Sequence, residues 1–195
     1  MEAFFVSLGV VALGEMGDKT QLLAFVLAAK FKRPLPIILG VLTATLVNHV
    51  FAGLLGQWVA AQLGPTLLRW VVGLSFLGMA GWVLVPDRID QAGEAGGATR
   101  AGLGIYGTTL AAFFLAEFGD KTQIATAALA ARYPDLLAVV AGTTAGMMLS
   151  DIPAILLGNR FARKIPMRIV HGIASAIFAV LGLLALLNVG AVFGP

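Results

Sequence analysis

Long apolar stretches separated by short polar segments run along almost the whole chain. Six such stretches can be marked, at residues 3–29, 35–63, 66–85, 103–131, 136–157 and 169–193. A helix rises 1.5 Å per residue, so each stretch can cross a hydrocarbon core of about 30 Å, some with tilt or protruding ends. The pattern therefore predicts an all-α membrane protein with six transmembrane helices.

Composition supports the same prediction. The chain has 195 residues, of which 59% are hydrophobic and 12% charged, and its mean hydropathy is +0.93. A soluble domain carries about 25% charged residues, so the bilayer is the expected solvent for this much apolar surface. The chain contains no cysteine, which excludes disulfides, thiolate metal sites and cysteine nucleophiles.

The placement of lysine and arginine predicts how the helices are oriented. Three of the expected connections carry nine basic residues: Lys30, Lys32 and Arg33 in the first, Arg88 and Arg100 in the second, and Arg160, Arg163, Lys164 and Arg168 in the third. The opposite ends of the helices carry only Arg69 and Arg132. The positive-inside rule places the basic connections in the cytoplasm and both termini outside it. Topology thus explains the basic residues, and a nucleic-acid surface is not expected.

The two halves of the chain repeat each other without a gap when the sequence is shifted by 102 residues. LGEMGDKTQLLAFVLAAKF in the first half aligns with LAEFGDKTQIATAALAARY in the second, and the register continues to Gly40 with Gly142. We expect residues 1–86 to form one three-helix repeat, residues 102–195 the other, and residues 87–101 a glycine-rich cytoplasmic linker between them.

With three spans in each repeat, the second repeat enters the membrane from the side opposite to the first. The two halves are then inverted relative to each other, about a pseudo-two-fold axis in the membrane plane. Many secondary transporters have this arrangement and bind their substrate at the midplane between the repeats, although some channels share it.

Seven charged residues fall near the middle of three expected spans. They are Glu15, Asp18 and Lys19 in the first span, Glu117, Asp120 and Lys121 in the fourth, and Asp151 in the fifth. Each costs roughly 2.5–3.5 kcal/mol on insertion scales, so exposing all seven to lipid would cost on the order of 20 kcal/mol. We therefore expect these side chains to face one another or a water-filled cavity.

The spacing within each motif predicts which side chains converge. Residues three and four apart share a face of a continuous helix, so Glu15 and Asp18 are expected to point the same way, with Gln21 about one turn further along. Gly17 and Gly119 leave room for another helix or an ion to approach the backbone. Pseudo-symmetry would bring the second motif to the opposite side of one shared site.

Clustered carboxylates with amide and hydroxyl oxygens form a hard-oxygen environment. Such an environment suits Mn²⁺, Ca²⁺ or Mg²⁺, and the absence of thiols disfavours softer ions. Five negative and two positive side chains give a formal charge of −3. A divalent cation would reduce this charge, and protons could neutralise it after the cation leaves. Competition between protons and a divalent cation is a natural basis for antiport.

Polar neighbours complete the predicted site. Besides the two acidic pairs, the predicted cation ligands are Asp151, Asn48, Gln21 and Gln123, and the predicted counter-ions or proton path are Lys19, Lys121, Thr20, Thr122 and Ser150. The lysines could be fixed counter-ions or moving parts of a proton cycle, and the threonines could simply bond a helical carbonyl. His49, the repeat mate of Asp151, is expected to be a packed or interfacial histidine, and His171 an interfacial one. An ion-pair network that only fixes helix packing is the alternative interpretation of the charges.

At EMGDKT (15–20) and EFGDKT (117–122) the chain resembles the cation/proton exchangers defined by two Glu-x-Gly-Asp-(Lys/Arg)-(Ser/Thr) motifs in six or seven membrane spans. Eukaryotic members of that family import Mn²⁺ and Ca²⁺ into the Golgi, and bacterial members export Mn²⁺. The resemblance covers essentially the whole chain, and both motifs match at every defined position. It implies a member located in the bacterial inner membrane, with a metal-coordinating role for the acidic residues of both motifs: Glu15, Asp18, Glu117 and Asp120.

The sequence thus predicts an antiporter that exports Mn²⁺, with Ca²⁺ as a further candidate, in exchange for protons. No tightly bound cofactor and no enzymatic activity are expected. Two alternatives stay open: a divalent-cation channel, and an intramembrane metal-dependent lipid-phosphate hydrolase. The hydrolase is disfavoured because the basic loops are short and follow the topology rule. Monomer and homo-oligomer are both compatible with the sequence.

Overall fold

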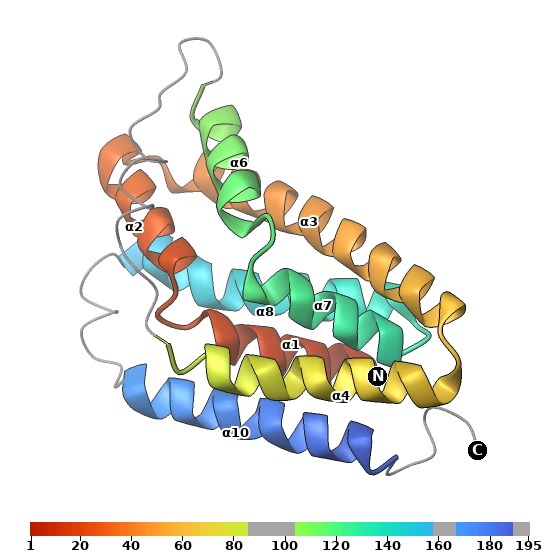
Figure 1. Cartoon of the computed structure of the whole chain (residues 1–195). Helices are drawn as coiled ribbons and strands as arrows, with labels where there is room; N and C mark the ends of the chain where they lie inside the picture. Colours follow the sequence, from red (N-terminus) through yellow and green to blue (C-terminus); the bar gives the residue numbers. More distant parts are fainter. Residues whose placement is uncertain (86–103, 158–166, 189–195) are drawn as a thin grey trace.

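The computed structural model describes residues 1–85, 104–157 and 167–188, and all regular structure within these ranges is α-helical (Figure 1). The helices are α1 (Glu2–Glu15), α2 (Lys19–Phe31), α3 (Pro34–Gln62), α4 (Pro65–Trp82), α6 (Gly104–Glu117), α7 (Lys121–Arg132), α8 (Leu136–Leu157) and α10 (Met167–Leu186). The predicted all-α class is confirmed for this part of the chain. The predicted linker at residues 87–101 lies outside the described residues, as do Arg160, Arg163 and Lys164.

Four of the predicted spans correspond to unbroken helices. Three of these helices are long and apolar enough to cross a membrane, over Pro34–Gln62, Leu136–Leu156 and Arg168–Leu186. They lie in α3, α8 and α10, at the predicted second, fifth and sixth spans. α4 is a single helix of 18 residues at the predicted third span.

The first and fourth predicted spans are each divided into two short helices. α1 and α2 replace the continuous helix expected over residues 3–29, and α6 and α7 replace the one expected over residues 103–131. Each of these helices has only 12 to 14 residues, too few to cross about 30 Å alone. The expectation of continuous helices was wrong because each acidic motif interrupts its helix.

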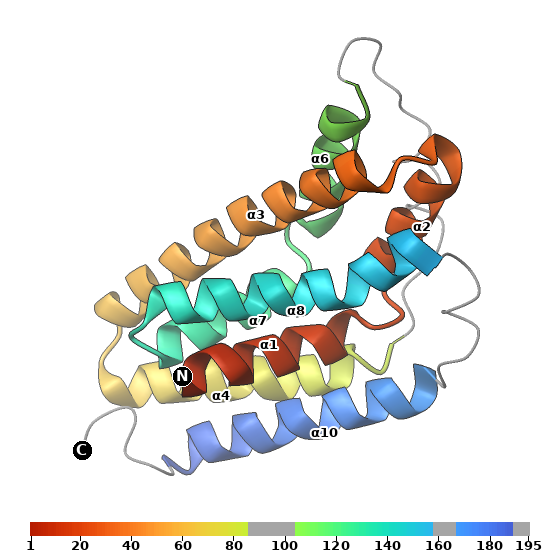
Figure 2. The ribbon, with the colours of Figure 1, turned by 180° about the vertical axis from the view of Figure 1, so that it is seen from behind.

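The helices run between two ends of the molecule (Figures 1 and 2). α1 begins at the end where α3 leads into α4, where α7 leads into α8, and where α10 finishes. α2, α4 and α8 finish at the other end, where α3, α6 and α10 begin. This course is the one expected of two repeats of opposite orientation, because equivalent helices of the two halves run in opposite directions.

The two repeats cross over each other instead of packing as separate blocks. α1 and α2 pack along α8 of the other repeat, α6 and α7 pack along α3, and α3 and α8 pack against each other. α4 and α10 pair along one side of this unit (Figures 1 and 2). Each broken span is therefore held by the long helix of the opposite half.

Equivalent glycines allow the same close helix contact in both halves. A Cβ atom on Gly40 of α3 would lie 2.8 Å from Cβ of Thr109 on α6, and one on Gly142 of α8 would lie 2.9 Å from Cβ of Ser7 on α1. Thr109 and Ser7 occupy the same position of the repeat. The aligned glycines thus serve close helix packing, as small residues do in many membrane proteins.

Two clusters of buried apolar side chains lie on either side of the interruptions. One cluster is built mainly from α1, α4, α7 and α10 and includes Phe76 and Phe178. The other is built from α2, α3, α6 and α8 and includes Leu27 and Phe113. The two parts of each broken span therefore belong to different clusters, and the acidic motifs lie at the junction between them.

Candidate cation site

Each acidic motif lies where a helix is interrupted. α1 ends at Glu15, Met16 is extended with φ −62° and ψ 116°, and Gly17 has φ 84°. Asp18, with φ −80° and ψ 169°, then caps α2, and its carboxylate accepts a hydrogen bond of 2.8 Å from the backbone N–H of Lys19. Glycine adopts a positive φ at little steric cost, which explains why glycine stands between the two acids.

The second motif repeats this backbone geometry. α6 ends at Glu117, Gly119 has φ 78°, and Asp120 precedes α7 with φ −79° and ψ 170°. The prediction that Glu15 and Asp18 share a helix face was therefore wrong, because one residue ends a helix and the other begins the next. Glycine followed by an N-capping aspartate is a known stop-and-start signal, so the interruption could have been found in the sequence.

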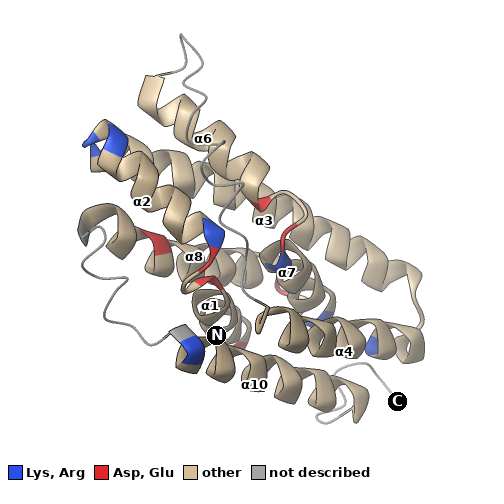
Figure 3. Ribbon diagram, turned by 60° about the vertical axis from the view of Figure 1, so that its left-hand side comes forward, with Lys and Arg blue, Asp and Glu red and all other residues tan. Residues whose placement is uncertain are grey.

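The two motifs meet through two ion pairs that cross between the repeats. Lys19 Nζ lies 2.8 Å from Asp120 Oδ1, and Lys121 Nζ lies 3.2 Å from Asp18 Oδ1. Each lysine thus neutralises the aspartate of the other motif. The structure brings the two motifs together at one place, and charged segments gather where the broken helices meet (Figure 3).

Three carboxylates of the two motifs lie close enough to share one cation. Oxygen atoms of Glu15, Asp18 and Asp120 lie within 4.8 Å of one another. These three residues are 0%, 3% and 5% exposed, and Glu117, within electrostatic range of Glu15, is 1% exposed. Metal–oxygen distances of about 2.0–2.6 Å place the ligands of one ion at most about 4–5 Å apart. The cluster therefore has the dimensions of a single cation site.

A threonine in each motif holds the glutamate of the same motif. Thr20 Oγ1 donates to Glu15 Oε2, and Thr122 Oγ1 donates to Glu117 Oε2, both at 2.8 Å. The threonines therefore bond carboxylates and not helical carbonyls. The other glutamate oxygens, both Oε1, and Asp120 Oδ2 are buried and have no hydrogen-bond partner among the described residues. Buried acceptors of this kind are rare in proteins and are open to an ion or a proton.

A glutamine in each repeat holds the interrupted backbone. Gln21 Oε1 accepts from the Gly17 N–H at 3.0 Å, and Gln123 Oε1 accepts from the Gly119 N–H at 2.8 Å. Gln21 Nε2 also donates to the carbonyl of Ser150 at 3.0 Å, whereas Gln123 Nε2 is buried with no partner in the described ranges. The side-chain oxygens of Gln21 and Gln123, both predicted cation ligands, thus accept hydrogen bonds from the interrupted backbone beside the acidic residues.

Asn48 and Ser150 occupy the same repeat position on the two long helices. Asn48 is 1% exposed and donates from Nδ2 to the Phe114 carbonyl at 3.3 Å, near the end of α6. Ser150 is 2% exposed and bonds Gln21 through its backbone carbonyl, with its hydroxyl oxygen 3.3 Å from Gln21 Nε2. Both residues therefore attach a long helix to the broken span beside it.

Asp151 on α8 adds a fifth buried carboxylate. It is 0% exposed, lies within electrostatic range of Asp18, and neither of its oxygens has a hydrogen-bond partner among the described residues. Its repeat mate His49 is also buried, with Nδ1 3.4 Å from Thr144 Oγ1, as expected of a packed histidine. The two motifs are thus equivalent by the repeat, whereas the acid Asp151 on α8 is matched by a histidine, His49, on α3.

The two interruptions differ in how they are covered. His171 Nε2 of α10 lies 2.9 Å from the carbonyl oxygen of Met16, beside the first interruption. At the second interruption, Leu115 and Phe118 are 72% and 62% exposed. The contact of His171 was not predicted, because its repeat mate is Arg69 and the internal symmetry gives no signal for it.

The chemistry of the site follows from this donor set. Carboxylate oxygens suit hard divalent cations such as Mn²⁺ and Ca²⁺. The ammonium groups of Lys19 and Lys121 occupy one oxygen of each aspartate, so a cation would compete with them for the same carboxylates. The same oxygens can also bind protons. The arrangement can therefore bind a divalent cation and exchange it for protons.

Comparison with known proteins gives a family match over both halves of the chain. The family described as "Divalent cation/proton antiporter GDT1" matches residues 3–91 and, separately, residues 105–191. This double match agrees with the internal repeat. No solved structure matches the chain.

Individual relatives match along nearly the whole chain. A Vibrio cholerae serotype O1 protein named "Putative manganese exporter" is 45% identical over 184 residues, which cover 94% of this chain and 90% of that protein. GDT1-like protein 3 of Oryza sativa is 30% identical over 200 residues, covering 91% of this chain and 71% of the relative. GDT1-like protein 5 of Arabidopsis thaliana is 27% identical over 229 residues, 96% of each chain.

Proposed function

The chain belongs to the GDT1 family of divalent cation/proton antiporters, and on this premise we propose that it exports Mn²⁺ from the bacterial cytoplasm in exchange for protons. The family is one of transporters, so the chain is not an enzyme. The 45% identity with the Vibrio cholerae protein supports Mn²⁺ as the main substrate. The oxygen donors would also accept Ca²⁺, which is the second candidate cation.

The observation that carries this proposal is the meeting of the two motifs at one buried cluster. The transported cation would lie between Glu15, Asp18 and Asp120, whose oxygens lie within 4.8 Å of one another. Glu117 and Asp151 would contribute charge and further oxygens from the second broken span and from α8. One cation site would thus be built jointly by both repeats, as in other transporters with inverted repeats.

The lysines of the motifs would act as built-in competitors of the cation. Lys19 pairs with Asp120, and Lys121 pairs with Asp18. A bound cation would replace these ammonium groups at the carboxylates, and the lysines would return when the cation leaves. Their return would again neutralise the buried carboxylates, whose unpaired negative charge would be costly at mid-membrane.

Protons would be the second competitor. Carboxylates that crowd together in a low dielectric repel one another, so protonation becomes easier once the cation has left. The unpartnered oxygens of Glu15, Glu117 and Asp151 are the groups where such protons would bind. Cation release on the acidic side and proton release on the other side would then couple the two fluxes.

Alternating access would come from movement at the two interruptions. The parts of each broken span belong to different apolar clusters, so a shift of one cluster against the other would open the site to one side at a time. We propose six membrane passes in the bacterial inner membrane, with the basic connections in the cytoplasm and both termini outside.

Mn²⁺ flux in proteoliposomes with an internal pH probe tests this function. The protein should move Mn²⁺ against its concentration gradient when a pH gradient is imposed, and Mn²⁺ added alone should release protons. Parallel assays with Ca²⁺ and Mg²⁺ would rank the substrates. Flux that only follows the Mn²⁺ gradient, without proton movement, would identify a channel and contradict the proposal.

A matched pair of aspartate variants assigns the flux to the site. Asp120→Asn keeps the shape of the side chain but removes a charge of the cluster, so we expect at least a tenfold loss of coupled flux. Asp135→Asn is the control, because Asp135 is exposed and its hydrogen bond from the Ala138 N–H can be kept by asparagine. Unchanged coupled flux in Asp120→Asn would exclude the proposed site.

A further inference from the structure

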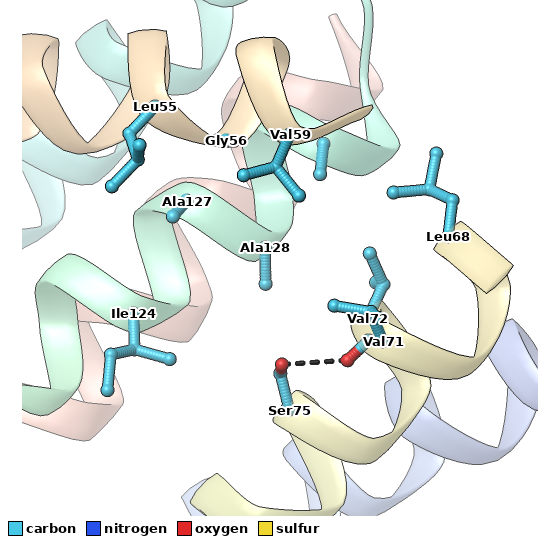
Figure 4. A pocket seen from close by; sticks show the side chains of 11 residues that line it. Leu55, Gly56, Val59, Leu68, Val71, Val72, Ser75, Ile124, Ala127 and Ala128 are labelled. Carbon is cyan, nitrogen blue, oxygen red and sulfur yellow. Dashed lines mark hydrogen bonds between the residues drawn. The ribbon is translucent and has the colours of Figure 1, made fainter. Parts of the chain in front are cut away.

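An apolar groove of about 200 Å³ lies between α3, α4 and α7 (Figure 4). α3 contributes Val59, α4 contributes Leu68 and Ser75, and α7 contributes Ile124 and Ala131. The hydroxyl of Ser75 donates to the Val71 carbonyl of its own helix at 2.7 Å, so it does not offer a free polar group. The groove is therefore apolar along its length.

The groove runs parallel to the helices that line it. It extends over eight residues of α4, from Leu68 to Ser75, and over eight residues of α7, from Ile124 to Ala131, which is seven helical steps on each helix. At 1.5 Å per residue this is a length of about 10 Å. Because α4 and α7 run in opposite directions (Figure 1), Leu68 and Ala131 lie at the same end.

The groove opens toward the outside of the helix unit. Three of its lining residues, Leu55, Val71 and Ile124, are 48%, 39% and 39% exposed. In a membrane this surface faces lipid, and water does not stably fill an apolar hollow that offers it no polar partners. A lipid acyl chain has the chemistry, shape and direction that the groove requires.

Two arginines flank one end of the groove. Arg69 directly follows Leu68, and Arg132 directly follows Ala131. Nε of both arginines and Nη1 of Arg132 are buried and have no hydrogen-bond partner among the described residues. A guanidinium donates in a planar fork that matches a phosphate group. The Arg132 guanidinium also lies over the ring of its neighbour Tyr133, with Cζ 5.4 Å from the ring centroid. By their positions in the chain, the two arginines place positive charge at this end of the groove.

We propose that this groove binds one anionic glycerophospholipid, with an acyl chain between α3, α4 and α7 and the phosphate between Arg69 and Arg132. The two arginines are the basic residues that the sequence places at this end of the helices, so an anionic headgroup is preferred here over a zwitterionic one. The bound lipid would join α4 to α3 and α7, and thus link the paired helices α4 and α10 to a broken span.

Native mass spectrometry of the full-length protein tests this site. The protein is reconstituted in vesicles of phosphatidylglycerol and phosphatidylcholine, re-extracted in detergent, and analysed for retained phospholipid. We expect one phosphatidylglycerol per chain to be retained in preference to phosphatidylcholine. Each basic residue near anionic lipid contributes about fivefold in affinity, so the double variant R69Q/R132Q should retain phosphatidylglycerol about 25-fold less tightly.

Two further variants separate the headgroup from the acyl chain. Arg33→Gln removes an exposed basic residue at the opposite end of the molecule and should leave lipid retention unchanged. Ala131→Phe fills the groove and should abolish retention of both lipids. If Ala131→Phe does not fold, the comparison of R69Q/R132Q with Arg33→Gln decides alone. Equal retention by R69Q/R132Q and wild type, or equal retention of both lipids by wild type, would overturn the proposal.

Discussion

At the scale of single residues, Gly17 and Gly119 determine where the acids of the site point. Their positive φ angles end one helix and allow the next to begin at the following aspartate. The aspartates then stand at helix N-termini, whose partial positive charge stabilises carboxylates, and the glutamates stand at helix C-termini, whose partial negative charge favours a cation. A single glycine thus gives each acid a different electrostatic role.

Replacement of the motif glycine by alanine should destabilise the protein. A non-glycine residue in the left-handed region costs about 1–2 kcal/mol, and a Cβ on Gly119 would meet no other atom within 4 Å, so backbone strain is the only cost. We expect Gly119→Ala to lower the melting temperature in detergent and to reduce Mn²⁺ transport. Gly9→Ala is the control, since Gly9 lies within α1 with open space around it and alanine is the better helix former. Equal melting temperatures for the two variants would contradict this explanation.

The threonine that bonds each glutamate is a second testable residue. Thr122→Val removes the charge-assisted hydrogen bond to Glu117, a bond of a class that contributes about 1.5–3 kcal/mol. We expect Mn²⁺ affinity to fall about tenfold, measured by titration calorimetry. Thr126, one turn further along α7, is buried with no partner for its hydroxyl in the described residues. Thr126→Val should therefore leave Mn²⁺ affinity unchanged, and an equal loss in both variants would count against a specific role for Thr122.

At the scale of helices, the close contacts of α3 with α6 and of α8 with α1 hold the broken spans in place. Gly142 lies against the backbone of Phe4 and the side chain of Ser7, so even a methyl group would push α8 away from α1. We expect Gly142→Ala to be destabilised by about 1–3 kcal/mol, the usual cost of overpacking. The measurement is the thermal unfolding of Gly142→Ala, compared with that of Gly172→Ala. Gly172 lies at an uncrowded position of α10 and serves as the control. A Gly142→Ala protein as stable as wild type would show that the contact is not close.

Hydropathy and internal repetition were enough to predict the all-α class of the described residues, the four unbroken helices and the fact that the two motifs meet. These features depend on patterns that extend over many residues and tolerate local error. The interruptions were missed because apolar residues continue on both sides of Gly17 and Gly119, although the glycine–aspartate step itself carried the signal. The contact of His171 with Met16 could not be predicted, because it depends on how α10 sits against α1.

The crosswise pairing of Lys19 with Asp120 also lay beyond the sequence. Within one continuous helix, Lys19 would have been expected beside Glu15, four residues away. Once the helix is interrupted, the lysine begins α2 and reaches the opposite motif instead. The sequence thus identifies the members of the cluster, whereas the backbone interruption decides their partners.

At the scale of the whole molecule, the two halves of the chain meet at one acidic cluster that is not fully symmetric. Asp151 lies within electrostatic range of Asp18, whereas its repeat mate His49 is packed beside Thr144. Within the described residues, α10 bonds the first interruption through His171 and not the second. These differences give the two halves distinct surroundings, as the proposed alternating access requires of any single conformation.

Proton competition at the site predicts the pH dependence of cation binding. If protons and Mn²⁺ compete for the same carboxylates, as we propose, Mn²⁺ affinity should fall as the pH is lowered and rise as the pH is raised. The expected slope is about tenfold per pH unit for each proton released per cation. Calorimetric titrations with Mn²⁺ at several pH values measure this slope. An affinity independent of pH would exclude direct competition.

The number of Mn²⁺ ions bound per chain, with and without one intact motif, tests the shared site most directly. Calorimetric titration of the full-length protein in detergent should give one Mn²⁺ per chain. Asp18→Asn and Asp120→Asn should each weaken this binding by more than tenfold, because each motif supplies part of the same site. Two ions per wild-type chain would show two independent sites, and one tightly bound ion retained in both single variants would show that the two aspartates do not build one shared site. Either result would contradict the central claim.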